Sequence, residues 1–415
     1  MNTEALAAQA LKNIKLTSGP MNDFRLTHLE LFKKNGLPNT KLEAYKFTNL
    51  STFLNALETS AYEGESVSFA DYLDPGFNNL VFIDGVLKNP VPLVEGITIK
   101  TIPEAFGAVS SELKDLNPLS NLHHGLLDSG VVIEIAAKTK VEKPIRLVNV
   151  VTKSGVTAPT FIIYALAFSE ASIIEENYDH AISHAALNET TVHVGSGAQL
   201  EHIQLSQGGA TALFHSSTQA FVARDGNYRN VLLNISGKLN RRNLNLELLD
   251  SGANGESYCL YLTNATEHSD LSTVIQHKAA DTTSSQIAKG ILDGDSKGIF
   301  TGKIHIHPHA QRVVSGQLNK NLLLSKKAQV HSQPQLEIFA DDVKCSHGST
   351  TGQLSDEEVF YFMARGIPAE KARTLLAYGF GLEIVHKIKN KVIRQKVESL
   401  VSESLKTKFQ LGGHS

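Results

Sequence analysis

The 415-residue sequence contains no tryptophan, three methionines and only two cysteines, Cys259 and Cys345. Two cysteines exclude a disulfide framework, and they also exclude a metal site built from cysteine alone within one chain. The 39 Lys and Arg residues are balanced by 42 Asp and Glu residues, so no positive surplus indicates a nucleic-acid partner. With 41% apolar and 20% charged residues, the composition is typical of a globular protein.

The sequence also lacks a recognisable targeting segment. Its first 21 residues contain neither the basic and apolar regions of a secretory signal nor the arginines of a transit peptide. The longest uncharged apolar stretch, Ser154 to Ser169, is too short and too polar to cross a bilayer core of about 30 Å. We therefore expect a soluble, cytoplasmic protein without a membrane partner.

Composition divides the chain into three expected regions: a mixed, partly helical domain over 1–122, a β-helix core over 123–352 and a helical domain over 353–415. In the first region, the apolar residues from Phe24 to Phe32 predict a helix that ends before Gly36. The run Leu80–Ile83, followed by Asp84-Gly85, predicts a short strand and a turn.

The middle region consists of short strand-like runs separated by Gly, Asn, Asp or Ser. Corner residues recur at spacings of 29 and 27, marked by Ala198, Asn227 and Asn254, and Ala310 and Ala328 repeat at a spacing of 18. This recurrence favours a mainly β fold, a stacked β-solenoid, over an irregular sandwich, which remains the alternative. Because a solenoid has open strand edges at its ends, each end must be capped or must pair with a partner.

The third region begins at Ser355, whose hydroxyl can cap a helix while Glu358 reaches back to it. Gly366 ends that helix, and Pro368 is suited to the first position of the next one. From Ala369 to about Lys408, apolar residues recur at helical spacing, and we expect one continuous helix there.

The segment with the most chemical information contains Cys345 and His347. On an extended strand these two residues share one face, about 7 Å apart along the chain. A thiolate and an imidazole are suitable ligands for iron, an iron–sulfur cluster or zinc. Two ligands cannot complete a tetrahedral site, so a metal centre here needs further ligands from elsewhere or from another chain. The alternative is a buried cysteine beside a strand-end histidine.

Other polar clusters are weaker candidates. His305, His307 and His309 alternate with apolar residues and could form a three-histidine metal site, or they could be the solvent face of a strand whose isoleucines are buried. Asp341-Asp342 could be a carboxylate pair for acid–base chemistry, but a turn with Asp capping is favoured. The sequence contains no phosphate-binding loop, dinucleotide-binding fingerprint, serine-hydrolase elbow or zinc-protease motif.

The residues from Leu336 to Gly352 read LEIFADDVKCSHGSTTG, which closely resembles the LEI-x-ADDV-x-C-x-HG-x-T-x-G hallmark of the SufB/SufD family of iron–sulfur cluster assembly proteins. Near the N-terminus, Glu43 to Thr48 resemble the family's E-x-W-[RK]-x-T motif, with Tyr45 in place of the usual tryptophan. Ser349 replaces the usual alanine. The chain is most similar to SufD, because SufB carries more cysteines.

The resemblance implies a right-handed parallel β-helix flanked by helical regions. It implies a non-catalytic scaffold subunit that pairs with SufB and docks two copies of the SufC ATPase, in support of de novo cluster assembly and iron acquisition. His347 would supply a ligand to a transient cluster or iron shared with SufB at the subunit interface, with Cys345 as a second contributor. The expected ATPase contacts lie on the C-terminal helices, at Phe360, Arg365, Tyr378 and Phe380.

No permanently held cofactor is expected in the isolated chain, and a flavin on the complex and a homodimer of the chain alone remain open. Two other functions were weighed. A carbohydrate-active β-helix enzyme would need aromatic platforms and a carboxylate pair, which this tryptophan-free chain does not offer. A stand-alone metal-binding protein would use His305, His307 and His309.

Overall fold

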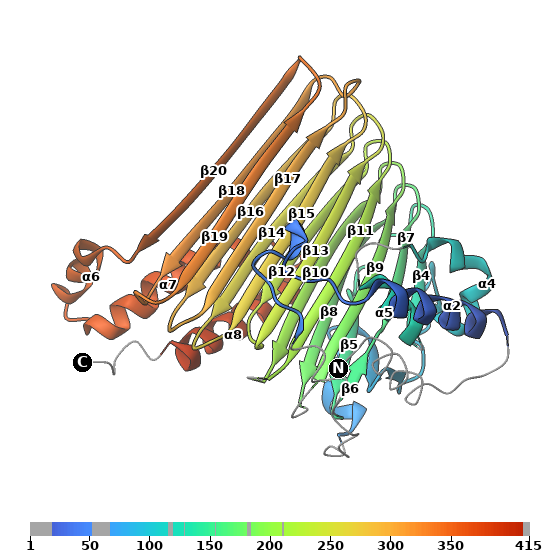
Figure 1. Cartoon of the computed structure of the whole chain (residues 1–415), viewed down its shortest axis with the longest axis horizontal. Helices are drawn as coiled ribbons and strands as arrows, with labels where there is room; N and C mark the ends of the chain where they lie inside the picture. The colour runs from blue at the N-terminus through green and yellow to red at the C-terminus, as the bar shows by residue number, and fades with distance from the viewer. Residues whose placement is uncertain are drawn as a thin grey trace.

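The computed structural model describes residues 19–51, 67–114, 119–127, 129–153, 155–180, 184–209 and 211–409. These residues form a parallel β-solenoid of about eight turns with helices at both ends (Figure 1). The mainly β fold predicted from the sequence is therefore confirmed, and the sandwich is excluded.

Two sheets, called here sheet A and sheet B, form the solenoid, and most consecutive strands alternate between them. Sheet A has the order β2 (Val86–Leu87), β1 (Asn78–Ile83), β5 (Ile145–Val151), β8 (Glu170–Asp179), β10 (Gln199–Gly208), β12 (Asn227–Asn234), β14 (Asn254–Thr263), β16 (Thr283–Leu292), β18 (Val313–Leu323) and β20 (Val343–Gln353). Sheet B has the order β19 (Gln329–Ile338), β17 (Lys297–Ile306), β15 (His268–His277), β13 (Leu239–Leu248), β11 (Leu213–Val222), β9 (His184–Val194), β7 (Thr160–Ala165), β4 (Gly130–Ile135) and β3 (Ile97–Thr101), with β6 (Gly155–Thr157) beside β9. Neighbouring strands are parallel except in the pairs β1–β2 and β3–β4.

The strand register corrects the repeat that was predicted from the sequence. Asn227 pairs with Asn254, as expected, but its partner on the other side is Gln199 and not Ala198. The 18-residue spacing of Ala310 and Ala328 is not a full coil, because these residues lie at two successive corners, before β18 and before β19. Equivalent positions are 27 residues apart at Asn227–Asn254 and 31 at Gln286–Gln317.

The corners explain the Gly, Asn and Asp residues between strands. Asp225 and Asp281 have positive φ angles of 56° and 59°, a conformation that aspartate tolerates better than most residues. Successive corners also bond to each other, since the Arg312 guanidinium donates to both Asp281 carboxylate oxygens at 2.6 and 2.7 Å. The corners therefore add a second ladder of contacts beside the strand hydrogen bonds.

The interior of the solenoid contains apolar clusters as well as buried polar side chains. Val131, Ile133, Phe161 and Ile163 belong to a buried cluster that fills the space between the two sheets. Alternate side chains of a strand face the interior, which is the reason that the strands show a period of two in their apolar residues.

Helices lie beside the first coils of the solenoid and along the outer face of sheet A (Figure 1). α2 (Pro20–Asn35), α4 (Ile102–Val109) and α5 (Ser120–Leu126) lie near β4, β7 and β9, and the short helices are η1 (Glu43–Tyr45), η2 (Phe69–Tyr72) and η3 (Ser110–Glu112). α2 ends before Gly36, as the sequence predicts. The predicted strand and turn at Leu80–Gly85 correspond to the end of β1 and a turn with positive φ at Asp84 and Gly85.

The C-terminal region contains α6 (Asp356–Met363), α7 (Ala369–Val385) and α8 (Lys391–Lys408). The Ser355 side chain accepts a hydrogen bond from the Glu358 amide, so the predicted cap is present. The expectation of one helix from Ala369 to Lys408 is wrong. Asn390 caps a new helix by accepting from the Val392 and Ile393 amides, which lets α8 fold back beside α7.

This break allows both α7 and α8 to pack on the outer face of sheet A. They share a buried apolar cluster whose members include Leu205, Leu233, Leu260, Ile384, Val397 and Leu405. A single continuous helix would leave most of that face uncovered, so the tertiary packing stabilises the turn at residues 386–390.

The domain boundaries remain a prediction. The first of them does not separate the N-terminal region from the solenoid completely. β1, β2 and β3 come from the first 122 residues, yet they belong to the two sheets of the solenoid. Within the described ranges, no helix combines the length and the hydrophobicity that a membrane crossing requires.

The buried histidine at the end of β15 makes stability depend on pH. The two ring nitrogens of His277 form hydrogen bonds with the Thr282 and Ser284 hydroxyls, at 2.7 and 2.9 Å, and burial lowers its pKa to about 4. Between about pH 6.5 and 4 the unfolded chain binds a proton at this residue and the folded chain does not. The free energy of unfolding should therefore fall as the pH falls through this window, by up to about 3 kcal/mol from this residue. Urea unfolding at a series of pH values tests this, and His277→Gln should have a shallower pH dependence; equal slopes would contradict the assignment.

Candidate functional site

The two ends of the solenoid are built differently. At the first end, the short antiparallel strands β2 and β3 close sheets A and B. At the other end, β20 and β19 are the last strands, and no strand in the described part of the chain pairs with their outer edges. Both are markedly more exposed than the strands behind them. This end of the solenoid is therefore open, in the sense that its backbone donors and acceptors are available to a partner.

Cys345 and His347 lie on β20, at this open end. Cys345 pairs with Ser315 and His347 pairs with Gln317, and both partners are buried residues of β18. Two positions further on, the Ser349 hydroxyl donates to the Ser332 hydroxyl of β19 at 2.8 Å, across the space between the sheets. By the alternation of a strand, Cys345, His347 and Ser349 share the inner face of the last coil. The predicted shared face is confirmed.

The two candidate ligands differ in their surroundings. Cys345 is half-buried beside a cluster that contains Ile304, Ile306 and Val313, and burial raises its pKa while the Ser315 backbone amide opposes the rise. His347 is exposed. Among the residues that the structure describes, no three His, Cys, Asp or Glu side chains are arranged to hold a metal ion. At the open end, the described residues thus bring at most two such side chains together.

Behind His347, a line of inward polar side chains runs back through the solenoid. The register joins His347 to Gln317, then to Gln286, Ser257, Asn230 and His202. Gln317 donates to Gln286 at 2.7 Å, and Gln286 donates to the Thr273 hydroxyl of sheet B at 2.6 Å. Gly302 leaves room for Gln317, because a Cβ there would lie 2.2 Å from the Gln317 amide nitrogen.

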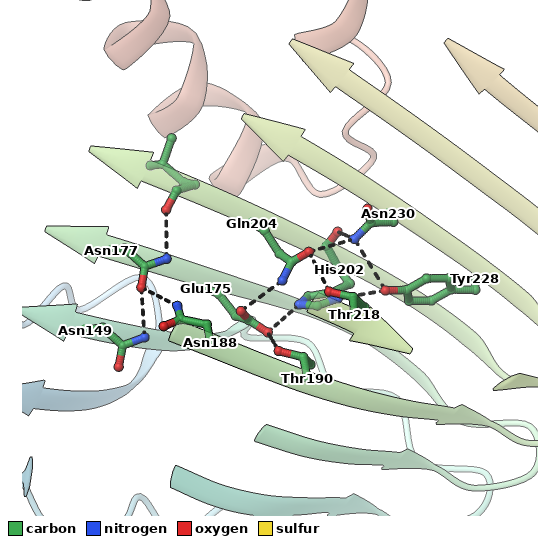
Figure 2. Close-up of polar contacts among 11 residues, drawn as sticks. Asn149, Glu175, Asn177, Asn188, Thr190, His202, Gln204, Thr218, Tyr228 and Asn230 are labelled. Atoms are coloured by element: carbon green, nitrogen blue, oxygen red, sulfur yellow. Dashed lines mark hydrogen bonds and ion pairs between the residues drawn. The ribbon is translucent and has the colours of Figure 1, made fainter. Parts of the chain in front are cut away.

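This line ends in a buried network around Glu175 (Figure 2). The Glu175 carboxylate contacts His202 at 2.8 Å and accepts from Thr190 at 2.9 Å and from Gln204 at 3.1 Å. The other ring nitrogen of His202 lies 2.8 Å from the Tyr228 hydroxyl. Burial opposes the ionised form of Glu175, but His202 and the hydrogen bonds lower its pKa overall. Glu175 and His202 are fully buried, so the network links the interior strands and is not an accessible catalytic site.

The three histidines predicted as a metal site have separate partners on the outer face of sheet B. His305 contacts Glu337 at 2.9 Å, His307 contacts Gln276 at 3.4 Å and His309 contacts the Lys278 carbonyl at 2.7 Å. Ile304 and Ile306 between them are fully buried. The alternative interpretation, a solvent face over buried isoleucines, describes these residues better.

Asp341-Asp342 lies in the corner between β19 and β20. The Asp342 carbonyl accepts from the Arg312 amide, and the Asp342 amide donates to the Gln311 side chain at 2.9 Å. The pair thus lies in a corner, as expected, and the backbone of Asp342 stacks this last corner on the one before; the contacts are those of the backbone and not of a capping Asp side chain.

Comparison with known proteins shows which family this chain belongs to. The family described as "SUF system FeS cluster assembly, SufBD core domain" matches residues 148–380, which is more than half of the chain. This chain belongs to the SufBD family.

Individual relatives are similar over nearly the whole length. A SufBD family protein of Synechocystis is 29% identical, with 95% of this chain and 94% of the relative covered. The iron–sulfur cluster assembly protein SufD of Escherichia coli is 27% identical, with 91% and 92% covered. A chloroplast protein of Arabidopsis thaliana named ABCI7 is 28% identical, with 93% and 86% covered. The chain is thus SufD-like, as its low cysteine content predicted.

The N-terminal motif of this SufBD protein forms an arm along the outer face of sheet B. The Tyr45 ring lies 4.0 Å from the Arg241 guanidinium, and Arg241 donates to the Ala44 carbonyl at 2.7 Å. The Thr48 hydroxyl donates to Asp270, which also binds Arg241. Tyr45 thus provides the aromatic face over a buried cation that the usual tryptophan could also provide.

The same arm reaches the open end. The Phe47 ring stacks on His331 of β19 at 4.3 Å between ring centres. The motif is recognisable in the sequence, but its partners are not, because Arg241 and Asp270 are nearly 200 residues away or further. Their only sequence signal is a charged residue at an outward position on each of two neighbouring strands.

The four residues expected to contact an ATPase divide into two pairs. Phe360 is 68% exposed on α6, and exposed Arg365 covers the neighbouring Tyr361 ring at 3.5 Å. Tyr378 and Phe380 instead pack against the cluster between α7, α8 and sheet A. Tyr378 donates to Glu398 at 3.2 Å, and the Lys289 ammonium lies 4.2 Å from the Phe380 ring centre. Phe360 and Arg365 are therefore accessible to a partner, and Tyr378 and Phe380 mainly attach α7.

Loss of the Arg241–Asp270 ion pair, which holds the N-terminal arm on sheet B, should lower the stability of the protein. Arg241 and Asp270 are each 2% exposed, so replacing Arg241 by Met leaves a buried carboxylate without its cation. We expect Arg241→Met to lower the free energy of unfolding by about 3–5 kcal/mol, measured by urea denaturation. The matched control is Arg312→Met, which removes an exposed pair with Asp281 and should cost much less. Equal losses in both variants would contradict the anchoring role.

Proposed function

We propose that this chain is a scaffold subunit of an iron–sulfur cluster assembly complex of the SufBCD type. It pairs with a SufB-like paralogue and docks a SufC-like ATPase, in support of de novo cluster assembly and iron acquisition. The observation that carries the proposal is the position of Cys345 and His347 together on the inner face of the open last coil.

The open end supports pairing with a second solenoid. β19 and β20 present unpaired edges, and the exposed apolar residues Ile338 and Phe339 join them at the corner. A related solenoid with the same coil spacing would match these edges in register, whereas a globular surface would not. The same edges allow a homodimer when the chain is alone.

The ligand set supports a shared site. His347 and Cys345 cannot complete a coordination sphere, and a partner's thiolates at the interface would supply the remaining ligands. Exposed His347 is the first candidate. Half-buried Cys345 is the second, because part of its surface is already taken by apolar neighbours. An imidazole in place of a thiolate also makes a bound cluster less negative, which favours its release.

The C-terminal helices support an ATPase contact on α6. Phe360, Tyr361 and Met363 are 68%, 56% and 48% exposed, an unusual density of large apolar side chains on an eight-residue helix. α6 follows β20 directly, so a partner on α6 would lie close in sequence to the strand that carries the candidate ligands.

In this proposal the chain works in the cytoplasm, holds iron or a cluster only transiently and has no catalytic activity of its own. A groove of about 350 Å³ beside Tyr45 on sheet B is lined by amide, hydroxyl and apolar groups and Arg241, without a carboxylate. It therefore lacks the acid pair that the carbohydrate-active alternative requires.

The first test concerns His347. His347→Ala should leave the complex with the SufB-like and SufC-like partners assembled but slow cluster formation at least about tenfold, since one of few ligands is lost. Cys345→Ala should have a smaller effect. Cluster formation is measured by bound iron and sulfide and by visible absorption after reconstitution.

The matched control is His309→Ala, an exposed histidine on the outer face of the same end. A His347→Ala complex that builds clusters at the wild-type rate would refute the ligand role. Failure of the His347→Ala complex to assemble would also count against it, because the residue would then be structural.

The second test concerns α6. Phe360→Ser should weaken binding of the ATPase subunit by about tenfold or more, because it removes an exposed aromatic anchor, while the fold of the chain is preserved. Binding is measured by titration calorimetry with the purified ATPase.

Val392→Ser is the control, since Val392 is 42% exposed on α8. Unchanged affinity in Phe360→Ser, with folding verified by circular dichroism, would remove α6 from the interface. Point variants are preferable to deletion of 355–415, which would expose the apolar outer face of sheet A.

A further inference from the structure

Arg242 is a buried cation inside the solenoid. It lies on β13, is 1% exposed, and reaches from sheet B across the interior to sheet A. Its guanidinium donates to the Asn234 side-chain oxygen at 3.2 Å and to the Ser206 hydroxyl. Both acceptors are neutral, so these bonds satisfy two N–H groups and leave the charge unbalanced.

The other buried arginines on the described strands have carboxylate partners. Arg146 binds Glu176 at 2.6 Å, and Arg241 binds Asp270. No Asp or Glu in the described residues lies within ion-pair distance of Arg242, and its Nη1 atom is buried without a hydrogen-bond partner. A water could accept that bond, but it could not neutralise the charge.

Neighbouring ionisable groups do not supply the missing charge. Glu175 acts on Arg242 only from a distance, because its oxygens are occupied by His202, Gln204 and Thr190. Burial raises the pKa of Cys259 to about 12 in spite of Arg242, so this thiol is neutral. Burial also lowers the pKa of Arg242, to about 10, which leaves it charged at neutral pH.

A second unpartnered group lies beside Arg242. Ser216 on β11 is in register with Arg242, is 2% exposed, and its hydroxyl has no hydrogen-bond partner. A guanidinium nitrogen and a hydroxyl on neighbouring strands can donate to one small acceptor. Because Arg242 and Ser216 are 1% and 2% exposed, the occupant that we consider is a monatomic ion or one of similar size.

We propose that the solenoid interior holds a small monovalent anion of the chloride type, bound by Arg242 Nη1 and the Ser216 hydroxyl. The anion supplies the counter-charge that the chain itself lacks at this position. It is therefore a built-in part of the folded solenoid, separate from the ligands at the open end.

Bromide is a suitable probe, because it replaces chloride and is located by anomalous diffraction. The full-length protein is purified and crystallised without chloride and with potassium bromide. Anomalous density beside Arg242 and Ser216 is expected. A water molecule or empty space at that position would overturn the proposal.

Thermal unfolding provides a test that needs no crystal. Potassium bromide should raise the Tm of the wild-type protein by about 2 °C relative to potassium gluconate at equal ionic strength, because the anion binds only the folded state. Arg242→Met replaces the cation by an apolar side chain of similar length, and it should abolish the difference between the two salts. Ser216→Ala should reduce it.

The variants also separate anion binding from a general effect of salt. A bromide effect that persists undiminished in Arg242→Met would assign the binding elsewhere and overturn the proposal. An equal Tm in bromide and gluconate for the wild type would do the same. Because Arg242→Met removes an unpaired charge, its Tm without bromide should equal or exceed that of the wild type, which shows that the variant is folded.

Discussion

The in-register parallel pairing of successive coils is the constraint on which the rest of this structure depends. Every strand of sheets A and B needs a neighbour on each side for its backbone groups, and each side chain stacks on the equivalent position of the next coil. The pairing therefore fixes which residues of successive coils are stacked on one another, and each such stack is called a column here. It also creates two ends at which the pairing must stop, and the two ends have different structures.

At the first end, antiparallel strands and helices end the pairing within the chain, whereas at the second end β19 and β20 leave it incomplete. The proposed ligands lie on the incomplete side. The same columns also carry polar side chains through the interior, where they bond across the sheets, as Gln204 does with Thr218 and Asn188 with Asn177. Among the buried arginines of the described strands, Arg146 and Arg241 have carboxylate partners and Arg242 has none.

Much of the fold could be predicted from local patterns. Short strands with Gly, Asn and Asp at corners predicted the solenoid, and Ser355 predicted the start of α6, because these signals involve residues close in sequence. The break between α7 and α8 was missed. The break occurs because both helices can then pack on the apolar outer face of sheet A. The helical periodicity of residues 369–408 does not show where such a turn lies. The register was off by one residue at Ala198, because corner residues mark a loop and not a strand position.

The sequence by itself determined the candidate ligands of this protein: two cysteines, and the Cys345–His347 pair at a spacing that shares a strand face. Only the tertiary structure decided where that chemistry lies. The stacking of the coils makes β20 the last strand of sheet A. α7 and α8 cover the outer face of sheet A, whereas large apolar side chains of α6 stay exposed. Folding also brings the Tyr45 ring onto Arg241. The reason is physical. Residue type and spacing act within one strand or helix, whereas burial and edge position depend on contacts between residues that are hundreds of positions apart.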